Sequence, residues 1–316
     1  MRLYFTSDIH GSQKCWLKFL AAPKFYDADT IIMGGDITGK LIVPIISKPN
    51  GRVEATFMGR KRRVKNSKEL ELLKKRIADT GQYWVEMTQD EFENYDENPS
   101  ELDALFEEIQ LERMREWLQL AEERLSGQDV RILVGAGNDD LYALDSVLAE
   151  SDFVEVPDGQ IVLLGDGFEM LTVPNANMTP WDCPRDIEEP ELAEKIRGLA
   201  EQIERMDRAI FNIHVPPYDT GIDEAPELTE DMQMIMSASG EPRMIPVGST
   251  AVREAILEHQ PMLGLHGHIH ESSGIRELGD TTLVNPGSEY AEGILRGALI
   301  DLDYDEGVTN IKLVAG

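Results

Sequence analysis

The sequence predicts a layered α/β fold, and three features of the chain support this. In the first half, short apolar segments typical of strands alternate with segments whose apolar residues repeat at helical spacing. The second half ends in several short strands separated by Gly and Asp turns, which is typical of antiparallel pairing. A length of 316 residues also suffices for one large core. We therefore expect a single domain over residues 1–316, built as a sandwich of two mixed sheets.

The first half contains three expected strands, at residues 3–7, 30–33 and 131–135, and a helix at residues 15–22. Active sites of α/β proteins form beyond the carboxyl ends of strands, so the residues that follow each strand are candidates for a site. These residues form three polar motifs: Asp8-Ile9-His10, Gly34-Gly35-Asp36 and Gly137-Asn138-Asp139-Asp140.

A segment of different character, residues 40–127, separates the second motif from the third. Residues 41–46 and 52–57 flank Pro49-Asn50-Gly51 and indicate a β-hairpin. Residues 67–78 and 101–125 indicate charged amphipathic helices. The segment also carries a basic cluster, Arg60-Lys61-Arg62-Arg63, which either recruits phosphate or pairs with the acidic helices that follow. We expect residues 40–127 to form an inserted cap of a hairpin and helices.

The second half begins with an expected hairpin, residues 160–164 and 168–173, that turns at Gly165-Asp166-Gly167. A polar loop over residues 174–190 precedes an expected helix at 191–208. Strands at 209–213 and 261–265 surround a helix at 250–259, and each strand leads directly to histidine. The remaining expected strands are at residues 274–277, 282–284, 297–303 and 309–314.

Composition narrows the possible partners and the cellular location. The chain has 30 basic and 59 acidic residues, a formal net charge of −29, which argues against binding to a nucleic-acid duplex. Its two cysteines lack CxxC spacing, which fits a reducing compartment. The first residues do not resemble a signal peptide, and no apolar run approaches the roughly 20 residues that cross a bilayer. We expect a cytoplasmic protein without a membrane partner.

The motifs and two later strand ends supply seven candidate metal ligands. Asp8 and His10 share one side of an extended segment, as do His268 and His270. Carboxylate, amide and imidazole groups without a thiolate suit Mn, Fe, Co, Ni or Zn. Seven ligands are too many for one tetrahedral ion, but they suit two divalent or trivalent ions that share a bridging carboxylate. The seven candidates are Asp8, His10, Asp36, Asn138, His214, His268 and His270.

The ordered series Asp-x-His, Gly-Gly-Asp, Gly-Asn-x-Asp, a lone His and Gly-His-x-His resembles the calcineurin-like metallophosphoesterase superfamily. This resemblance covers most of the chain outside residues 40–127. It implies a four-layer α/β/β/α sandwich and a hydroxide, held between two ions, that attacks phosphorus. It also implies a division of the ligands: Asp8, His10 and His270 on one ion, Asn138, His214 and His268 on the other, and Asp36 on both.

The third motif departs from the commonest family pattern, which has His where this chain has Asp139. A carboxyl group there could act as general acid only if burial or neighbouring carboxylates raise its pKa, whereas an ionised one would repel phosphate. We therefore expect Asn138 and Asp139 to act in catalysis with an altered substrate preference, towards diesters. We further expect Asp140 to accept a hydrogen bond from a ligand histidine such as His10. In the 174–190 loop, Arg185 is a candidate contact for the leaving group.

The function that these features favour is metal-dependent hydrolysis of a small phosphate ester, by a phosphodiesterase rather than a monoesterase. Two alternatives stay open at this stage. One is a nuclease, which the negative charge disfavours unless the insertion carries a basic groove. The other is a metal-binding scaffold with weak catalysis, for which the departure at Asp139 is the argument.

Overall fold

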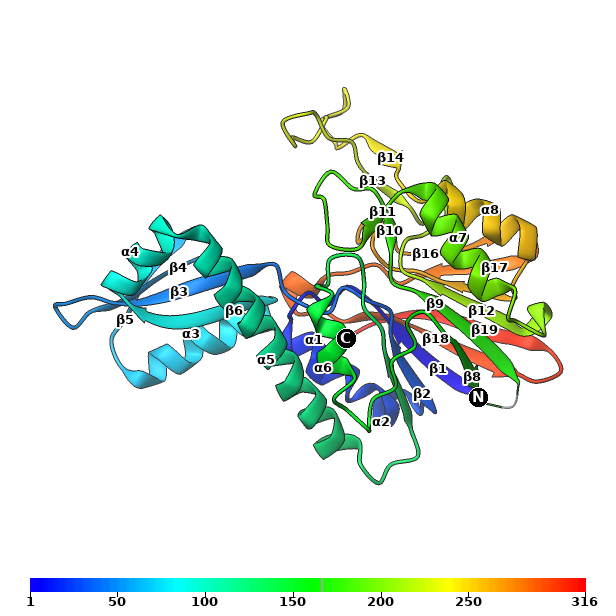
Figure 1. The fold of residues 1–316 in the computed structure, drawn as a ribbon, viewed down its shortest axis with the longest axis horizontal. Coiled ribbons are helices and arrows are strands. Elements are labelled where there is room, and N and C mark those ends of the chain that lie inside the picture. The colour runs from blue at the N-terminus through cyan, green and yellow to red at the C-terminus, as the bar shows by residue number, and fades with distance from the viewer. Residues whose placement is uncertain (166) are drawn as a thin grey trace.

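The computed structural model describes residues 1–165 and 167–316 (Figure 1). Its first large sheet is mixed, because β1, β2 and β7 run parallel whereas β18 and β19 pair antiparallel at one side. The predicted strands at 3–7, 30–33 and 131–135 therefore lie next to one another. The spatial order of the sheet is β19 (Gly307–Ala315), β18 (Arg296–Asp303), β1 (Arg2–Thr6), β2 (Thr30–Met33) and β7 (Arg131–Val134).

The second large sheet is also mixed, with four parallel central strands and an antiparallel strand at each edge. Its edge strand β8 pairs with β9, as the predicted hairpin requires. The turn predicted at Gly165-Asp166-Gly167 includes residue 166, which lies outside the described residues. The spatial order is β16 (Gly274–Leu278), β17 (Thr281–Asn285), β15 (Leu263–Leu265), β12 (Ala209–Ile213), β9 (Phe168–Val173) and β8 (Ile161–Leu164).

The two sheets pack face to face, and helices cover both outer faces (Figure 1). Between the sheets, Leu3, Phe5 and Ile32 of the first meet Met170 and Ile210 of the second in one buried cluster. The predicted four-layer α/β/β/α sandwich is thus confirmed. One outer layer consists of α1 (Gln13–Phe19), α2 (Ala22–Tyr26), α5 (Pro99–Leu125) and α6 (Ala143–Leu148), and the other of α7 (Glu189–Ala200) and α8 (Thr250–His259).

The segment after the second motif forms a four-stranded sheet with its own apolar cluster, which extends away from the sandwich (Figure 1). The predicted hairpin is β3 and β4, and the predicted helix at 67–78 is α3. Three further elements were not expected, because β5 is almost entirely charged and β6 and α4 lack a clear period. The elements are β5 (Arg60–Val64), β4 (Val53–Phe57), β3 (Leu41–Ser47), β6 (Gln82–Thr88), α3 (Ser67–Asp79) and α4 (Gln89–Glu97).

Helix α5 joins this small sheet to the sandwich. Its second half is buried against α1, where the rings of Trp117 and Trp16 stack with centroids 4.9 Å apart. That half therefore belongs to the core of the sandwich as much as to the insertion, and the division at residues 40–127 stays a proposal. Although α5 has 27 residues, no helix among the described residues is long and apolar enough to cross a membrane.

The helix predicted at 191–208 is shorter than expected and ends at Ala200. The carboxylate of Glu169 accepts hydrogen bonds from the backbone N–H groups of Glu204 (3.1 Å) and Arg205 (2.8 Å), which removes both from a helical ladder. A 3-10 turn, Met206–Arg208, then leads into β12. The remaining short elements are β10 (Ala176–Asn177), β11 (Asp186–Ile187), β13 (Glu224–Pro226), β14 (Met244–Pro246) and the 3-10 turn Tyr290–Glu292.

Candidate metal centre

The candidate ligands follow the carboxyl ends of five parallel strands, three in the first sheet and two in the second. Asp8 and His10 follow β1, Asp36 follows β2, and Asn138 follows β7. Because these ends meet at one edge of the sandwich, side chains from distant parts of the sequence come together there. The structure brings all seven predicted ligands to this edge, the three from the second sheet being His214 after β12 and His268 and His270 after β15.

One group of ligands gathers around His10 and His270, whose Nε2 atoms are 3.0 Å apart. The His270 Nε2 atom also lies 3.4 Å from Asp8 Oδ1, and the His10 Nε2 atom lies 3.6 Å from Asp36 Oδ2. The tautomers of the two rings decide which nitrogen carries a proton in this contact. Two imidazole nitrogens and two carboxylates that converge this closely form a donor set that suits a cation.

A second group gathers on the other side of Asp36. The Asp36 Oδ1 atom lies 3.4 Å from His214 Nε2, and Asp36, His214 and His268 could all reach one ion. The Oδ1 atom of Asn138 is 2.8 Å from His268 Nδ1 and completes this group. The two oxygens of Asp36 therefore face different groups, which is the placement that a bridging carboxylate needs.

His214 offers an independent test of whether these residues fit a metal ion. Its Nδ1 atom is 3.0 Å from the carbonyl oxygen of Gly34, which assigns the ring proton to Nδ1 in the neutral imidazole. Its Nε2 atom is buried, makes no hydrogen bond among the described residues, and faces the carboxylates of Asp36 and Asp8 at 3.4 and 3.9 Å. A buried ring nitrogen between two carboxylates is a place that suits a cation, so the donor set fits the group that the motifs imply.

The backbone at the centre is held in an unusual conformation. Asp8, His10, Asp36 and His268 have positive φ angles of 58°, 37°, 50° and 64°. For residues with a side chain this costs on the order of 1–3 kcal/mol each and is found mostly at functional sites. Before Asp36, only glycine fits at position 35, because a Cβ there would lie 2.7 Å from Ala136 O and from His214 Nδ1. The motif Gly34-Gly35-Asp36 thus allows the loops to approach closely.

The electrostatic environment divides the histidines into two classes. Burial lowers the pKa of His10 to about 3 and that of His268 to about 4, so both rings are neutral at physiological pH. Burial also disfavours the charged form of His214, but the Asp36 carboxylate outweighs it and raises the pKa of His214 to about 10. His214 and His10 in turn hold the pKa of Asp36 well below its usual value, against burial. The metal-free centre therefore keeps a proton where a cation would sit.

Asp140 supports the centre, but through a different partner from the one predicted. Its carboxylate accepts hydrogen bonds from the backbone N–H groups of Ile37 (3.0 Å), Thr38 (2.8 Å) and Gly137 (2.9 Å), and from the hydroxyl of Thr38 (2.7 Å). It forms no hydrogen bond with His10 within the described residues. Asp140 therefore ties the loop that carries Asp36 to the loop that carries Asn138, and the predicted bond to a histidine is wrong.

Arg185 also differs from its prediction. Its side chain is buried, and its guanidinium donates to Asp140 O (2.8 Å), Leu141 O (2.9 Å) and the Asp145 carboxylate (2.5 Å). These contacts hold the chain that follows the third motif and leave no free face for a leaving group. The prediction of a substrate contact is corrected accordingly. In the same loop Trp181 is 64% exposed.

Sequence reasoning missed Asp186, which orients one of the ligands. The Asn138 Nδ2 atom donates to Asp186 Oδ1 at 2.7 Å, and this turns the amide oxygen of Asn138 towards the centre. Asp186 is itself fixed by the backbone N–H groups of Thr179 (3.1 Å) and Cys183 (3.0 Å). The only signal in the sequence was the polar character of the 174–190 loop.

Two further residues at the centre were missed, Lys40 and Tyr290. The Lys40 Nζ atom lies 2.8 Å from the carboxylate of Asp139, and the ring of Tyr290 packs 4.8 Å from that of His10. Burial and the nearby Asp36 carboxylate raise the pKa of Asp139. The contact with Lys40 opposes this rise, so Asp139 is held as one half of an ion pair.

Asp158 lies behind the third motif, where its Oδ2 atom accepts from the N–H of Ala136 at 2.8 Å. Its Oδ1 atom is buried without a partner among the described residues, and burial raises its pKa to about 7. The carboxyl in the unfolded chain titrates near 4. Between these values the folded chain binds more protons than the unfolded chain. The contribution of Asp158 to stability is therefore present at low pH and lost as pH rises through this window.

We expect Asp158→Asn to remove this loss, because the amide oxygen can still accept from Ala136 without carrying charge. In urea unfolding, the free energy of unfolding of the variant relative to the wild type should be higher at pH 8 than at pH 5 by on the order of 1–4 kcal/mol. Asp152→Asn, an exposed substitution nearby, is the matched control and should track the wild type. Equal pH dependence in Asp158→Asn and the wild type would contradict the assignment.

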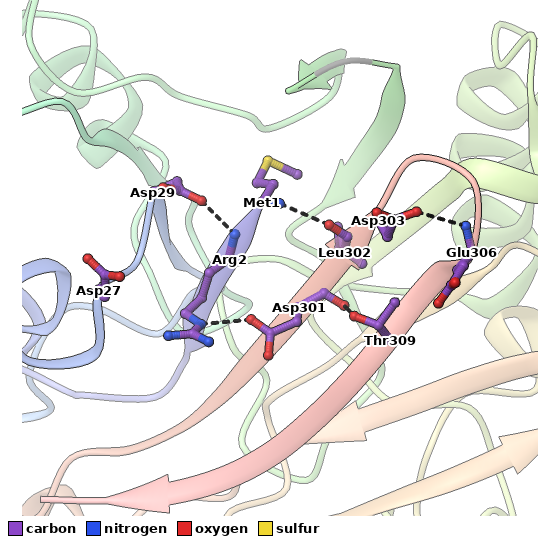
Figure 2. Close-up of a pocket in the computed structure, with 9 residues that line it drawn as sticks. All are labelled: Met1, Arg2, Asp27, Asp29, Asp301, Leu302, Asp303, Glu306 and Thr309. Atoms are coloured by element: carbon purple, nitrogen blue, oxygen red, sulfur yellow. Dashed lines mark hydrogen bonds and ion pairs between the residues drawn. The ribbon is translucent and has the colours of Figure 1, made fainter.

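A separate hollow of about 410 Å³ lies at the opposite end of β1, beside its first residues (Figure 2). Two of its acidic groups have a partner in Arg2, whose Nε donates to Asp301 at 2.7 Å and whose backbone N–H donates to Asp29 at 2.7 Å. These bonds close the end of the first sheet. The hollow contains none of the candidate ligands, which lie at the other edge.

Comparison with known proteins agrees with the fold. No protein-family model matches the sequence. An uncharacterized protein of Methanocaldococcus jannaschii is 28% identical over 124 residues, which are 38% of this chain and 49% of that protein. The chain thus matches about half the length of this curated relative.

Among solved structures, a protein of Thermus thermophilus superimposes with a TM-score of 0.56 at 14% identity, covering 100% of this chain and 97% of that one. An archaeal phosphodiesterase matches with a TM-score of 0.38 at 11% identity, covering both chains fully. The first match shows a shared fold, whereas the second is too distant to support an argument. The match to the Thermus protein thus shows that the layered α/β fold is shared with a solved structure.

Proposed function

We propose that this chain is a two-metal phosphoesterase that hydrolyses a small phosphate ester, with a preference for diesters over monoesters. The observation that carries the proposal is the pair of ligand groups on either side of Asp36, one of which contains the buried Nε2 atom of His214, 3.4 Å from Asp36 Oδ1. In this proposal one ion is held by Asp8, His10 and His270, the other by Asn138, His214 and His268, and both by Asp36.

Two ions of the Mn, Fe, Co, Ni or Zn type would supply a water nucleophile at neutral pH and neutralise charge that develops on the phosphoryl oxygens. The chain prepares the donors for this. The low pKa values of His10 and His268 keep their lone pairs free, and Asp186 turns the amide oxygen of Asn138 inwards. Asp140 fixes the distance between the loops of Asp36 and Asn138, so the bridging position is set before a substrate binds.

The preference for diesters rests on Asp139, which replaces the more usual histidine of the third motif. A phosphodiester carries one negative charge, whereas a monoester carries close to two above pH 7. A carboxylate beside the centre repels the doubly charged monoester more strongly than the singly charged diester. Asp139 therefore supports a diester substrate.

The experiment that tests this function compares bis-p-nitrophenyl phosphate with p-nitrophenyl phosphate, using metal-stripped protein reconstituted with Mn, Co, Ni or Zn. We expect turnover only after reconstitution, faster with the diester, together with two bound ions per chain by elemental analysis. Turnover that persists in the presence of a chelator would refute the two-metal mechanism. Two bound ions without hydrolysis of either ester would favour the scaffold alternative, and salt-dependent binding of single-stranded DNA would favour a nuclease.

A further inference from the structure

Lys40 brings a positive charge to the open side of the candidate metal centre. It is the last residue before β3, the first strand of the insertion. Its Nζ atom lies 2.8 Å from Asp139 Oδ2, and the same carboxylate oxygen lies 3.6 Å from His10 Nδ1. The side chain of Lys40 is 46% exposed, and its ammonium group contacts Asp139.

Asp139 is anchored at the centre as well as paired. Its backbone N–H donates to Asp36 Oδ1 at 3.0 Å, which places it directly beside the proposed bridging carboxylate. Its side chain is 21% exposed, about half as much as that of Lys40. The ammonium group is therefore held at a defined place next to the centre, instead of sampling solvent as an exposed lysine does.

We propose that Lys40 and Asp139 form a charge-balanced pair that contacts the phosphate ester and sets the discrimination between singly charged diesters and doubly charged monoesters. Lys40 donates a hydrogen bond to a non-bridging phosphate oxygen. Asp139 positions the Lys40 ammonium group and opposes its attraction for phosphate, twice as strongly for a dianion as for a monoanion. This inference rests on the proposed function of the site and adds the group that selects the substrate class.

The selection follows from the dependence of Coulomb energy on the product of the charges. Each unit of charge at the pair acts twice as strongly on a dianion as on a monoanion at the same distance. Removing the negative charge of Asp139 therefore favours the monoester, and removing the positive charge of Lys40 disfavours it. The two substitutions are expected to shift the ratio of kcat/KM for monoester to that for diester in opposite directions. A purely structural role would lower both rates alike.

The test compares Lys40→Met, Lys40→Arg and Asp139→Asn with the wild type in metal-reconstituted protein at about pH 8, where the monoester is a dianion. Lys65→Met and Asp129→Asn are matched controls, because these exposed residues carry the same charges away from the centre. The measurements are kcat/KM for both p-nitrophenyl esters, metal content, and calorimetric binding of inorganic phosphate and of dimethyl phosphate.

We expect Lys40→Met to lower kcat/KM for the monoester by roughly 10- to 100-fold and for the diester by less, whereas Lys40→Arg retains most activity. Asp139→Asn is expected to raise the monoester-to-diester ratio by about 3- to 10-fold. Binding of inorganic phosphate should weaken in Lys40→Met more than binding of dimethyl phosphate. The two control variants should leave the ratio and the binding unchanged.

The outcomes separate this inference from the proposed function. The proposed role of the pair is wrong if the wild type is active but Lys40→Met and Asp139→Asn leave the monoester-to-diester ratio of kcat/KM unchanged. It is also wrong if Asp139→Asn loses a metal ion. A wild type that hydrolyses neither ester but binds phosphate in a Lys40-dependent way would support the pair and contradict the function. A metal-loaded wild type that neither binds phosphate nor hydrolyses an ester would overturn both.

Discussion

Asp36→Asn is expected to abolish hydrolysis of bis-p-nitrophenyl phosphate. Asp36 Oδ2 lies 3.6 Å from His10 Nε2 and its Oδ1 lies 3.4 Å from His214 Nε2, so each oxygen serves one ligand group. An amide has one weak acceptor oxygen and no charge, and it cannot bridge two cations in the same way. We expect a loss of kcat/KM well beyond the roughly 10- to 100-fold that follows removal of an outer supporting group. Metal content should fall below two ions per chain.

The same substitution has a second readout that does not depend on turnover. The Asp36 carboxylate is the largest influence that raises the pKa of His214, to about 10, against the effect of burial. In metal-free Asp36→Asn this pKa should fall, and the ring should titrate at lower pH in an NMR experiment. Circular dichroism would show whether the variant is folded, with Asp129→Asn as a control for loss of one acidic charge. Full activity with two ions bound in Asp36→Asn would exclude the bridging role.

The candidate ligands could be identified in the sequence because each follows a short apolar strand. The strand pattern is local, but the extended geometry expected for the pair Asp8 and His10 was wrong, because both residues have positive φ angles, 58° and 37°. The two mixed sheets could be predicted because the apolar runs of β1, β2, β7 and β12 are clear, whereas the four layers were implied by the family resemblance. These features need only a few adjacent residues to be recognised.

The supporting residues could not be predicted, because their roles depend on where distant loops meet. Asp140 accepts from Thr38, which lies 102 residues earlier, and Asp186 holds Asn138 from 48 residues away. Lys40 reaches Asp139 only because the insertion starts directly beside the second motif. No periodicity or spacing encodes these contacts, and the predicted partners of Asp140 and Arg185 were wrong for that reason.

The basic strand β5 forms ion pairs that were not predicted from the sequence. The cluster at residues 60–63 was expected either to recruit phosphate or to pair with the acidic helices that follow. In the structure Lys61 and Arg63 instead contact Glu54 on the neighbouring strand β4, at 2.8 and 3.3 Å. Antiparallel pairing of β4 with β5 creates this contact, and the pairing was not visible in a strand of charged residues.

Asp140→Ala is expected to weaken both the fold and the metal centre. The buried carboxylate accepts from three backbone N–H groups and one hydroxyl, of residues 37, 38 and 137. Each donor left unsatisfied costs about 1–3 kcal/mol, so the free energy of unfolding should fall by on the order of 4 kcal/mol or more. Since the loops of Asp36 and Asn138 then lose their common anchor, we expect metal affinity to drop about 10- to 100-fold.

Asp140→Asn separates the two effects of the carboxylate, because it keeps the shape and one acceptor oxygen but removes the charge. Because the amide oxygen still accepts from some of the backbone N–H groups, we expect a smaller loss of stability than in Asp140→Ala. Because the amide nitrogen cannot accept from the others, the loops are still held less firmly, and we expect a similar loss of metal affinity. Urea unfolding of the metal-free protein and calorimetric titration with Mn²⁺ measure the two quantities, with Asp152→Asn as an exposed control. If Asp140→Ala unfolded at the same urea concentration as the wild type and bound Mn²⁺ equally well, the two loops would hold their positions without Asp140, and ligand placement would have to come from the strands alone.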